Sequence, residues 1–236
     1  MMHPVSAAAP AAPAIAQGCR INIGCGPAPT PGYINYDNNI LVVLARVPGA
    51  MGLLRTLGAL QTEHYDQRQF GRTVREYGVR WANCSRHIPL PDATVRVAYC
   101  SHMYEHLDRN EARRFLAEVA RALMPGGWLR LLVPDLRLFV DSYLQNGDAD
   151  WFIDRLRVSV PNPATLAGRV RRAVVGQRHH LWMYDRTSIV KSLEQAGCFD
   201  RVSVLPPGRT NIDDIGGIDL CEREDESIYV EARKRP

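Results

Sequence analysis

The sequence predicts an α/β fold with a mainly parallel sheet, and three observations carry this prediction. Strand-like segments alternate with helical ones through the body of the chain, which is typical of parallel sheets with crossover helices. The apolar run from Trp128 to Val133 has the length and composition of a strand buried on both faces. The last two strand-like segments follow one another without a helix, so we expect this pair to be antiparallel.

The strands are predicted from short runs of alternating or continuous apolar residues. These runs cover residues 20–23, 33–36, 79–83, 95–100, 128–133, 201–205 and 228–232. The expected architecture is therefore a seven-stranded sheet with an antiparallel last strand and with helices on both faces.

Two helices have clear start and stop signals. Residues 110–124 place their apolar side chains on one face, with Asp108 as the N-cap and Pro125-Gly126-Gly127 as the stop. A second helix, over residues 188–196, begins at Asp185 or Thr187 and ends at Gly197.

The chain is predicted to hold one domain. Residues 1–18 are rich in Ala and Pro and resemble a flexible leader rather than a signal peptide. Residues 19–236 form the domain, with helical inserts at about 40–77 and 137–178. The apolar stretch 40–60 approaches the length of a membrane span, but its two arginines and its Pro-Gly break favour two short helices.

Composition excludes several classes of protein. The 236 residues carry a net charge of +4, with 46% hydrophobic and 23% charged residues, as in soluble globular proteins. A charge this small does not indicate nucleic-acid binding. None of the six cysteines forms a C-x-x-C pair, so we expect no metal site and interpret the cysteines as reduced thiols of a cytoplasmic protein.

The turn after the first strand is the candidate ligand site, because ligands of doubly wound sheets bind at the carboxyl ends of the strands. Gly24 and Gly26 allow a ligand to approach the backbone closely, although a plain tight turn would also use them. Asp37 ends the next strand, where a carboxylate can accept both hydroxyls of a ribose. Position 29 is a proline instead of the third glycine of a dinucleotide fingerprint, which disfavours a pyrophosphate and therefore NAD.

Four segments occur in an order and spacing that match one family. They are residues 21–37 (INIGCGPAPTPGYINYD), 88–107 (IPLPDATVRVAYCSHMYEHL), 115–136 (FLAEVARALMPGGWLRLLVPDL) and 180–204 (HLWMYDRTSIVKSLEQAGCFDRVSV). On these segments the chain resembles a class I S-adenosylmethionine-dependent methyltransferase of the type 11-like subgroup with a shortened first helix. The resemblance spans residues 20–236 apart from the two inserts, and it implies a Rossmann-like fold with S-adenosylmethionine as cofactor.

The resemblance also implies the cofactor-binding residues. Gly24 and Gly26 would line the amino-acid part of the cofactor, and Asp37 would hold the ribose. In this family a carboxylate often meets the adenine amino group, and here Asn83 takes its place and can accept through its amide oxygen. The complete predicted set is Asn22, Ile23, Gly24, Cys25, Gly26, Asp37, Asn83, Cys84, Ser101 and His102.

Methyl transfer to a hydroxyl needs a base, for which histidine is suited near neutral pH. His102 ends the fourth strand beside the cofactor, and His180 follows the second insert; we expect these two to be catalytic. His102 could instead be a hydrogen-bonded residue of the pocket wall. The expected acceptor contacts are Tyr104, Asp135, His179 and Tyr184, with packing the alternative for the tyrosines and helix capping the alternative for Asp135.

The inserts are expected to determine the acceptor, because the sheet itself is generic. Arginines outnumber acidic residues in both inserts, and the second contains Arg169, Arg171, Arg172 and Arg178. This predicts an anionic or lipid-linked small-molecule acceptor, against the alternative of a solvated helix face. The apolar stretch 40–60 leaves three alternatives open: a surface that contacts a membrane, a homodimer surface and a lid over the site.

The predicted function is therefore O- or N-methylation of a small molecule, for example in glycan, lipid or secondary-metabolite biosynthesis. Two alternatives stay open at this point. One is an enzyme that uses S-adenosylmethionine without transferring its methyl group. The other is an inactive scaffold protein with the same fold, against which the intact Gly24, Gly26 and Asp37 count.

Overall fold

The strands of the computed structural model, which describes residues 18–56, 67–158 and 179–236, form one sheet in the order β3-β2-β1-β4-β5-β7-β6. They are β1 (Cys19–Ile23), β2 (Ile34–Asp37), β3 (Arg80–Trp81), β4 (Val95–Ser101), β5 (Leu123–Pro134), β6 (Phe199–Leu205) and β7 (Ser227–Lys234). Strands β1 to β5 pair in parallel, and β7 is antiparallel to both β5 and β6. The predicted Rossmann-like sheet is confirmed.

The order of the strands places the site. The chain runs outward from β1 to β3 on one side and then returns to β4 on the other side of β1. The reversal between β1 and β4 is the topological switch point, where the carboxyl ends of the strands leave room for a ligand.

The helices of the described residues are short except at the centre of the chain. They are α1 (Leu41–Leu44), α2 (Ala50–Thr56), α3 (Gln67–Glu76), α4 (Arg109–Ala122), α5 (Leu136–Asn146), α6 (Ala149–Leu156), α8 (Arg186–Gln195) and the 3-10 helix η1 (Tyr104–His106). None of these described helices combines the length and the hydropathy needed to cross a bilayer.

Helix α4 shows how local signals and burial agree. Asp108 accepts from the backbone of Asn110 and Glu111, and the Glu111 side chain accepts from the Asp108 N–H, which completes a capping box. Its apolar face packs against the sheet, and the buried side chains are Ala112, Phe115, Leu116, Val119, Ala120 and Ala122.

The boundary between α4 and β5 differs from the prediction. The helix ends at Ala122, and the strand begins at Leu123 instead of residue 128. Gly126 has φ +75°, and the pairing of β4 with β5 shifts in register between Val95 and Val97. The Pro-Gly-Gly sequence is therefore part of an irregular strand start rather than a separate stop.

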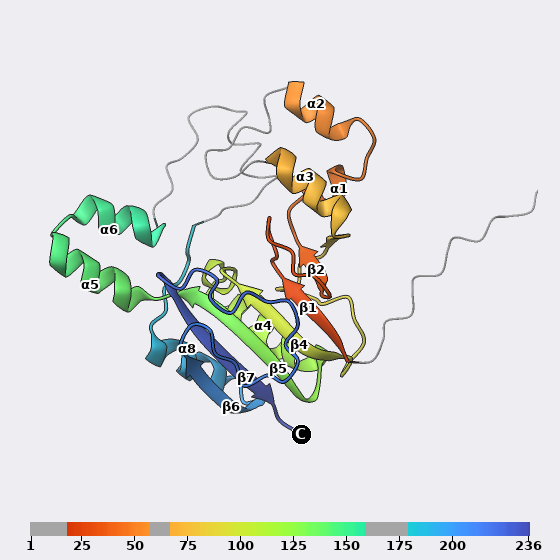
Figure 1. Ribbon diagram of the computed structural model, residues 1–236. Helices are drawn as coiled ribbons and strands as arrows, with labels where there is room; N and C mark the ends of the chain where they lie inside the picture. The colour runs from red at the N-terminus through yellow and green to blue at the C-terminus, as the bar shows by residue number, and fades with distance from the viewer. Residues whose placement is uncertain (1–17, 57–66, 159–178) are drawn as a thin grey trace, which may run out of the picture.

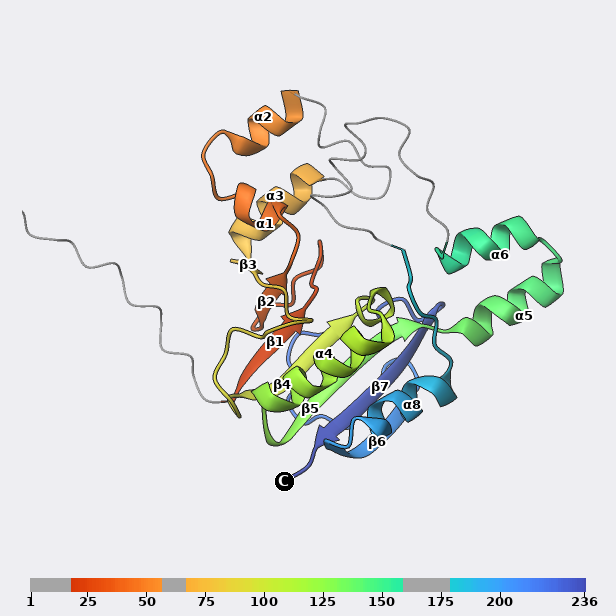
Figure 2. The ribbon, with the colours of Figure 1, turned by 180° about the vertical axis from the view of Figure 1, so that it is seen from behind.

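The two faces of the sheet are covered differently. Helices α4 and α8 lie on one face, as Figure 2 shows, and the segment between β6 and β7 crosses the other (Figure 1). That segment buries Ile212, Ile215 and Ile218 against Val97 and Tyr99 of β4. Over β4 and β5, a loop thus covers the face opposite α4 and α8. Pro27, Pro29 and Pro31 prevent a regular helix between β1 and β2.

A buried ion pair fixes this loop to the sheet. Arg130 of β5 donates to Glu231 of β7 at 2.7 Å, and both side chains are fully buried. Glu231 also accepts from the Thr210 hydroxyl and the Asn211 N–H, and Arg130 donates to the carbonyl of Arg209.

Both predicted inserts contain helices. Helices α1 to α3 extend beyond the β2–β3 edge of the sheet, and α5 and α6 form a pair that projects from the end of β5 (Figure 1). The Tyr143 and Phe152 rings, with centroids 5.1 Å apart, join that pair. The leader and the cluster Arg169, Arg171, Arg172 and Arg178 lie outside the described residues.

Candidate functional site

The turn after β1 is built from two glycines in the left-handed region. Gly24 has φ +70° and Gly26 has φ +50°. A Cβ added to Gly24 would lie 2.9 Å from the Cγ of Met103, whereas a Cβ added to Gly26 would meet nothing within 4 Å. The backbone at Gly26 therefore borders open space, as a turn that receives a ligand requires.

Asp37 is bonded directly to this turn. One carboxylate oxygen accepts from the Gly26 N–H at 2.8 Å, and the other accepts from the Asn39 N–H at 2.7 Å. Each carboxylate oxygen can accept two hydrogen bonds, so both keep an acceptor position. Asp37 can thus hold two ribose hydroxyls while it fixes the turn.

The segment after β3 lies against Asp37. The Ala82 N–H donates to the carbonyl of Asp37 at 3.1 Å. Burial, and then the charge of Asp37, raise the pKa of the Cys84 thiol to about 12, and the same two causes raise the pKa of Cys25. Both thiols are therefore protonated near neutral pH, so they line the site and do not act as nucleophiles.

Asn83 has a local partner that the sequence did not reveal. Its amide oxygen accepts from the Ser85 hydroxyl at 2.6 Å. An adenine amino group would share that oxygen, and the Asn83 amide nitrogen is a second group suited to a purine edge. The prediction that Asn83 meets adenine remains untested.

Asn22 and Ile23 have structural roles. The Asn22 amide donates to the Thr30 hydroxyl at 3.0 Å and is buried under the loop between β1 and β2. The Ile23 side chain belongs to the core beneath α4. Both side chains are thus used by the loop and the core, and the prediction that these residues line the cofactor rests on their backbone next to the turn.

Ser101 and His102 are bonded to the start of β7 and to the segment before it. The Ser101 hydroxyl donates to Glu222 at 2.9 Å. The Nε2 of His102 lies 2.8 Å from the Ser227 hydroxyl, and its Nδ1 lies 3.3 Å from the guanidinium of Arg223. With both ring nitrogens engaged, the geometry favours the pocket-wall alternative for His102 over a general base.

A buried carboxylate lies directly beyond His102. Glu105 is fully buried, and neither of its oxygens has a hydrogen-bond partner. Its Oε1 lies 3.5 Å from His102, 3.9 Å from His106 and 3.8 Å from His180. Burial opposes the charged form, but the imidazoles of His102 and His106 outweigh it and lower the pKa of Glu105.

Two segments far apart in sequence meet at this carboxylate. The backbone N–H groups of Leu181 and Trp182 donate to the carbonyl of Glu105, at 2.8 and 3.1 Å. His106 donates from Nδ1 to the carbonyl of His179 at 2.9 Å. The predicted His179 thus contributes its backbone, and His180 contributes a buried imidazole whose pKa is lowered to about 4, chiefly by burial.

The predicted acceptor contacts Tyr104 and Tyr184 belong to the core. Both side chains are fully buried, their rings pack with centroids 5.3 Å apart, and the Tyr104 hydroxyl bonds to Ser192. Asp135 accepts from the Arg137 N–H as the N-cap of α5. The structure thus favours the packing alternative for the two tyrosines and the capping alternative for Asp135, and a contact of these side chains with the acceptor stays a prediction.

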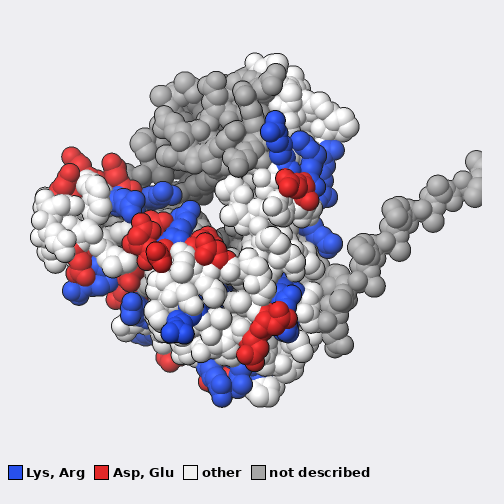
Figure 3. Space-filling view, in the orientation of Figure 1, with Lys and Arg blue, Asp and Glu red and all other residues white. Residues whose placement is uncertain are grey.

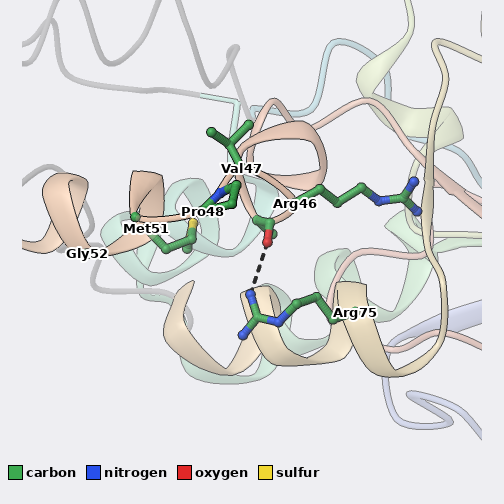
Figure 4. Close-up of a pocket in the computed structure, with 8 residues that line it drawn as sticks. Arg46, Val47, Pro48, Met51, Gly52 and Arg75 are labelled. Carbon is green, nitrogen blue, oxygen red and sulfur yellow. Dashed lines mark hydrogen bonds between the residues drawn. The ribbon is translucent and has the colours of Figure 1, made fainter. Parts of the chain in front are cut away.

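The first insert contains a pocket of about 300 Å³ beside α2. Arg75 donates to the carbonyl of Ala45 at 3.0 Å, and Arg46, which points away from the pocket, donates to the carbonyl of Val79 at 2.8 Å (Figure 4). Lys and Arg side chains gather on this part of the surface (Figure 3). Two of the arginines expected to attract an anion thus hold the insert together.

Glu105 is the residue that sequence reasoning missed. The signal was present, because Glu105 and His106 lie in the short segment between the fourth strand and the next helix. Its partner His180 is separated from it by the whole second insert, so only the fold reveals the cluster.

The turn and Asp37 fit S-adenosylmethionine. The open space at Gly26 admits the ligand, and the two acceptor positions on Asp37 match vicinal hydroxyls. No helix begins at this turn, which would be needed to hold the pyrophosphate of a dinucleotide.

Comparison with known proteins gives one family match. The family of methyltransferase domains matches residues 21–131, just under half of the chain and all of the segment from β1 into β5. A comparison with curated proteins gave no match.

Among solved structures, one similar protein is a Thermotoga maritima S-adenosylmethionine-dependent methyltransferase described as a possible histamine N-methyltransferase. It is 15% identical, with 94% of this chain and 84% of that chain covered and a TM-score of 0.49. A second, from Methanosarcina mazei, is 17% identical, with 94% and 93% covered and a TM-score of 0.46.

Proposed function

Because residues 21–131 of this chain match the family of methyltransferase domains, we propose that the protein is an S-adenosylmethionine-dependent methyltransferase that acts on a small-molecule acceptor at oxygen or nitrogen. The hydrogen bond from Gly26 to Asp37 is the observation that carries the cofactor half of this proposal. It joins the two predicted motifs in one site at the switch point of the sheet.

Each residue of the cofactor site has a distinct task. The backbone of Gly24 and Gly26 gives close access to the amino-acid part of the cofactor, and Asp37 accepts the ribose hydroxyls. Asn83 meets the adenine edge, and the buried thiols of Cys25 and Cys84 line the site near Asp37. When bound, S-adenosylmethionine supplies a methyl group already activated by its sulfonium.

The protein must then align the acceptor and exclude water. His102 is the wall residue of this part of the site, held by Ser227 on one side and facing Glu105 on the other. The excess of arginines over acidic residues in the sequences of both inserts favours an anionic or lipid-linked acceptor. His102 therefore positions the acceptor rather than removing its proton.

The first experiment is calorimetric titration with S-adenosylmethionine, S-adenosylhomocysteine and NAD in parallel. We expect micromolar binding of the first two and none of NAD. Anionic sugars, lipids and phenols are then screened as acceptors by the release of S-adenosylhomocysteine.

The two alternatives give different results in this experiment. An enzyme that uses the sulfonium differently would bind the cofactor but form another product. A scaffold protein would bind none of the three ligands, and that result would overturn the proposal.

A further inference from the structure

The buried carboxylate of Glu105 lacks the partner that its charge demands. A fully buried carboxylate without hydrogen bonds is costly unless a cation or strong donors compensate it. Its ion-pair neighbours among the described residues are the imidazoles of His102, His106 and His180, all at 3.5 Å or more from Oε1. These distances are too long for good hydrogen bonds, yet each imidazole faces the same oxygen.

Three of these groups are arranged as a ligand set. One ligand atom from each of Glu105, His106 and His180 lies within 4.8 Å of the others. Ligands bonded at about 2.0–2.1 Å around a tetrahedral ion lie about 3.3 Å apart, so a movement of about 1 Å would close the set. The rings of His106 and His180 already meet edge to face, with centroids 5.1 Å apart.

The surrounding hydrogen bonds orient the ligands. His106 donates from Nδ1 to the carbonyl of His179, so its Nε2 carries the lone pair that faces Glu105. This use of one ring nitrogen by a backbone carbonyl is the usual support of a metal-bound histidine. The carbonyl of Glu105 accepts from Leu181 and Trp182, which fixes the segment of His180 against the segment of Glu105.

We propose that Glu105, His106 and His180 bind a divalent transition-metal ion of the zinc type. Two imidazoles and one carboxylate are a ligand set that Zn²⁺ and Fe²⁺ use in proteins, whereas Mg²⁺ prefers oxygen ligands and keeps its waters. His106 is 28% exposed and the other two side chains are buried. An open coordination position would therefore face the His106 side of the cluster.

The test is titration of Zn²⁺ into the chelator-treated full chain by calorimetry. We expect one equivalent to bind, Mg²⁺ at the same concentration to give no signal, and Zn²⁺ to raise the melting temperature. Co²⁺ in place of Zn²⁺ should give visible absorption bands of a nitrogen- and oxygen-bound ion. Absence of a 1:1 complex with the unmodified protein would overturn the proposal, since no variant is involved.

Variants identify the ligands. Glu105→Gln and His106→Gln should each weaken Zn²⁺ binding at least about 100-fold. His106 is the partly exposed ligand, so its variant tests the site even where Glu105→Gln disturbs folding. The control is His87→Gln, because the exposed His87 side chain lies 2.9 Å from the largely buried carboxylate of Glu118, away from this cluster.

Unchanged Zn²⁺ affinity in the ligand variants, or its loss in His87→Gln, would contradict the assignment. The same samples titrated with S-adenosylmethionine report the cofactor site separately. Failure of the metal site and failure of the proposed methyltransferase function are therefore distinguishable.

Discussion

The N–H of Gly26 donates to the carboxylate of Asp37 at 2.8 Å, which joins the turn after β1 to the end of β2. The bond fixes the conformation of the turn without ligand and leaves acceptor positions on the same carboxylate. Binding therefore requires little rearrangement at this point, and this lowers the entropic cost of ordering the site.

Replacing Asp37 should weaken cofactor binding without preventing folding. Asp37→Ala removes charge-assisted hydrogen bonds and should cost about 1–3 kcal/mol of binding free energy. Calorimetry with S-adenosylhomocysteine measures the change. The Asp37→Asn variant keeps one carbonyl oxygen, so its affinity should lie between that of the unmodified protein and that of Asp37→Ala. Unaltered affinity in Asp37→Ala would contradict the ribose assignment.

The two turn glycines should respond differently to a methyl group. Gly24→Ala should destabilise the fold by more than about 2 kcal/mol, because the positive φ adds to a clash with Met103. A Cβ at position 26 meets no neighbour, so Gly26→Ala should lower the free energy of unfolding by only about 1 kcal/mol. The same variant should weaken cofactor binding at least about tenfold. Urea unfolding and calorimetry on both variants make the comparison, and equal stability losses would refute it.

His102 should prove to be a positioning residue. His102→Gln should keep cofactor affinity and lower turnover less than about tenfold, with the pH profile of kcat unchanged. Steady-state kinetics with an acceptor from the screen provides the test. A fall of about 10²–10⁴ together with loss of the pH dependence would instead identify it as the general base.

The ion pair between Arg130 and Glu231 should be costly to break from one side. Glu231→Gln leaves a buried guanidinium uncompensated and should lower the free energy of unfolding by about 3–5 kcal/mol. Replacing both residues with apolar ones of similar volume should recover much of that loss. Urea unfolding decides the matter, and a loss under about 1 kcal/mol for Glu231→Gln would show that the pair is dispensable.

Glu118 should contribute to the loss of stability of the protein at acid pH. Its bond to Arg121 and the backbone N–H of Ile88 lower the pKa of Glu118 to about 2 despite partial burial. A lowered carboxyl pKa contributes stability that is complete above pH 4.5 and is lost as the pH falls toward 2. After allowance for solvent screening, Glu118→Gln should remove about 1 kcal/mol at pH 7 and little at pH 2.

The exposed Glu194 on α8 provides the matched control for this pH dependence. Glu194→Gln should leave the unfolding free energy unchanged at both pH values. An equal effect of Glu118→Gln at pH 7 and pH 2 would assign its role to packing rather than charge.

The sequence predicted those parts of the fold that depend on local signals. The strands, the capped helix α4 and the motif of Gly24, Gly26 and Asp37 follow from periodicity, capping and turn chemistry within short windows. The start of β5 was mispredicted, because Pro125-Gly126-Gly127 is an ordinary helix stop in sequence and an irregular strand in the sheet.

The acceptor side of the site depends on contacts that no short window contains. The packing of α8 decides whether Tyr104 lines a pocket or the core, and here its hydroxyl bonds to Ser192 of α8. Glu105 and His180 meet only because the chain returns to η1 after the second insert. Such pairings are set by tertiary structure, so residue types alone could not assign them.

The position of β7 between β5 and β6 has a consequence for the order of events on the ribosome. Strand β6 is synthesised before β7 but has no sheet partner until β7 is inserted against β5. The apolar edge of β5 and the unpaired β6 therefore stay open to chaperones and to other nascent chains until residue 234 has left the exit tunnel. Strand β6 thus joins the sheet only after β7, which is synthesised later, has paired with β5.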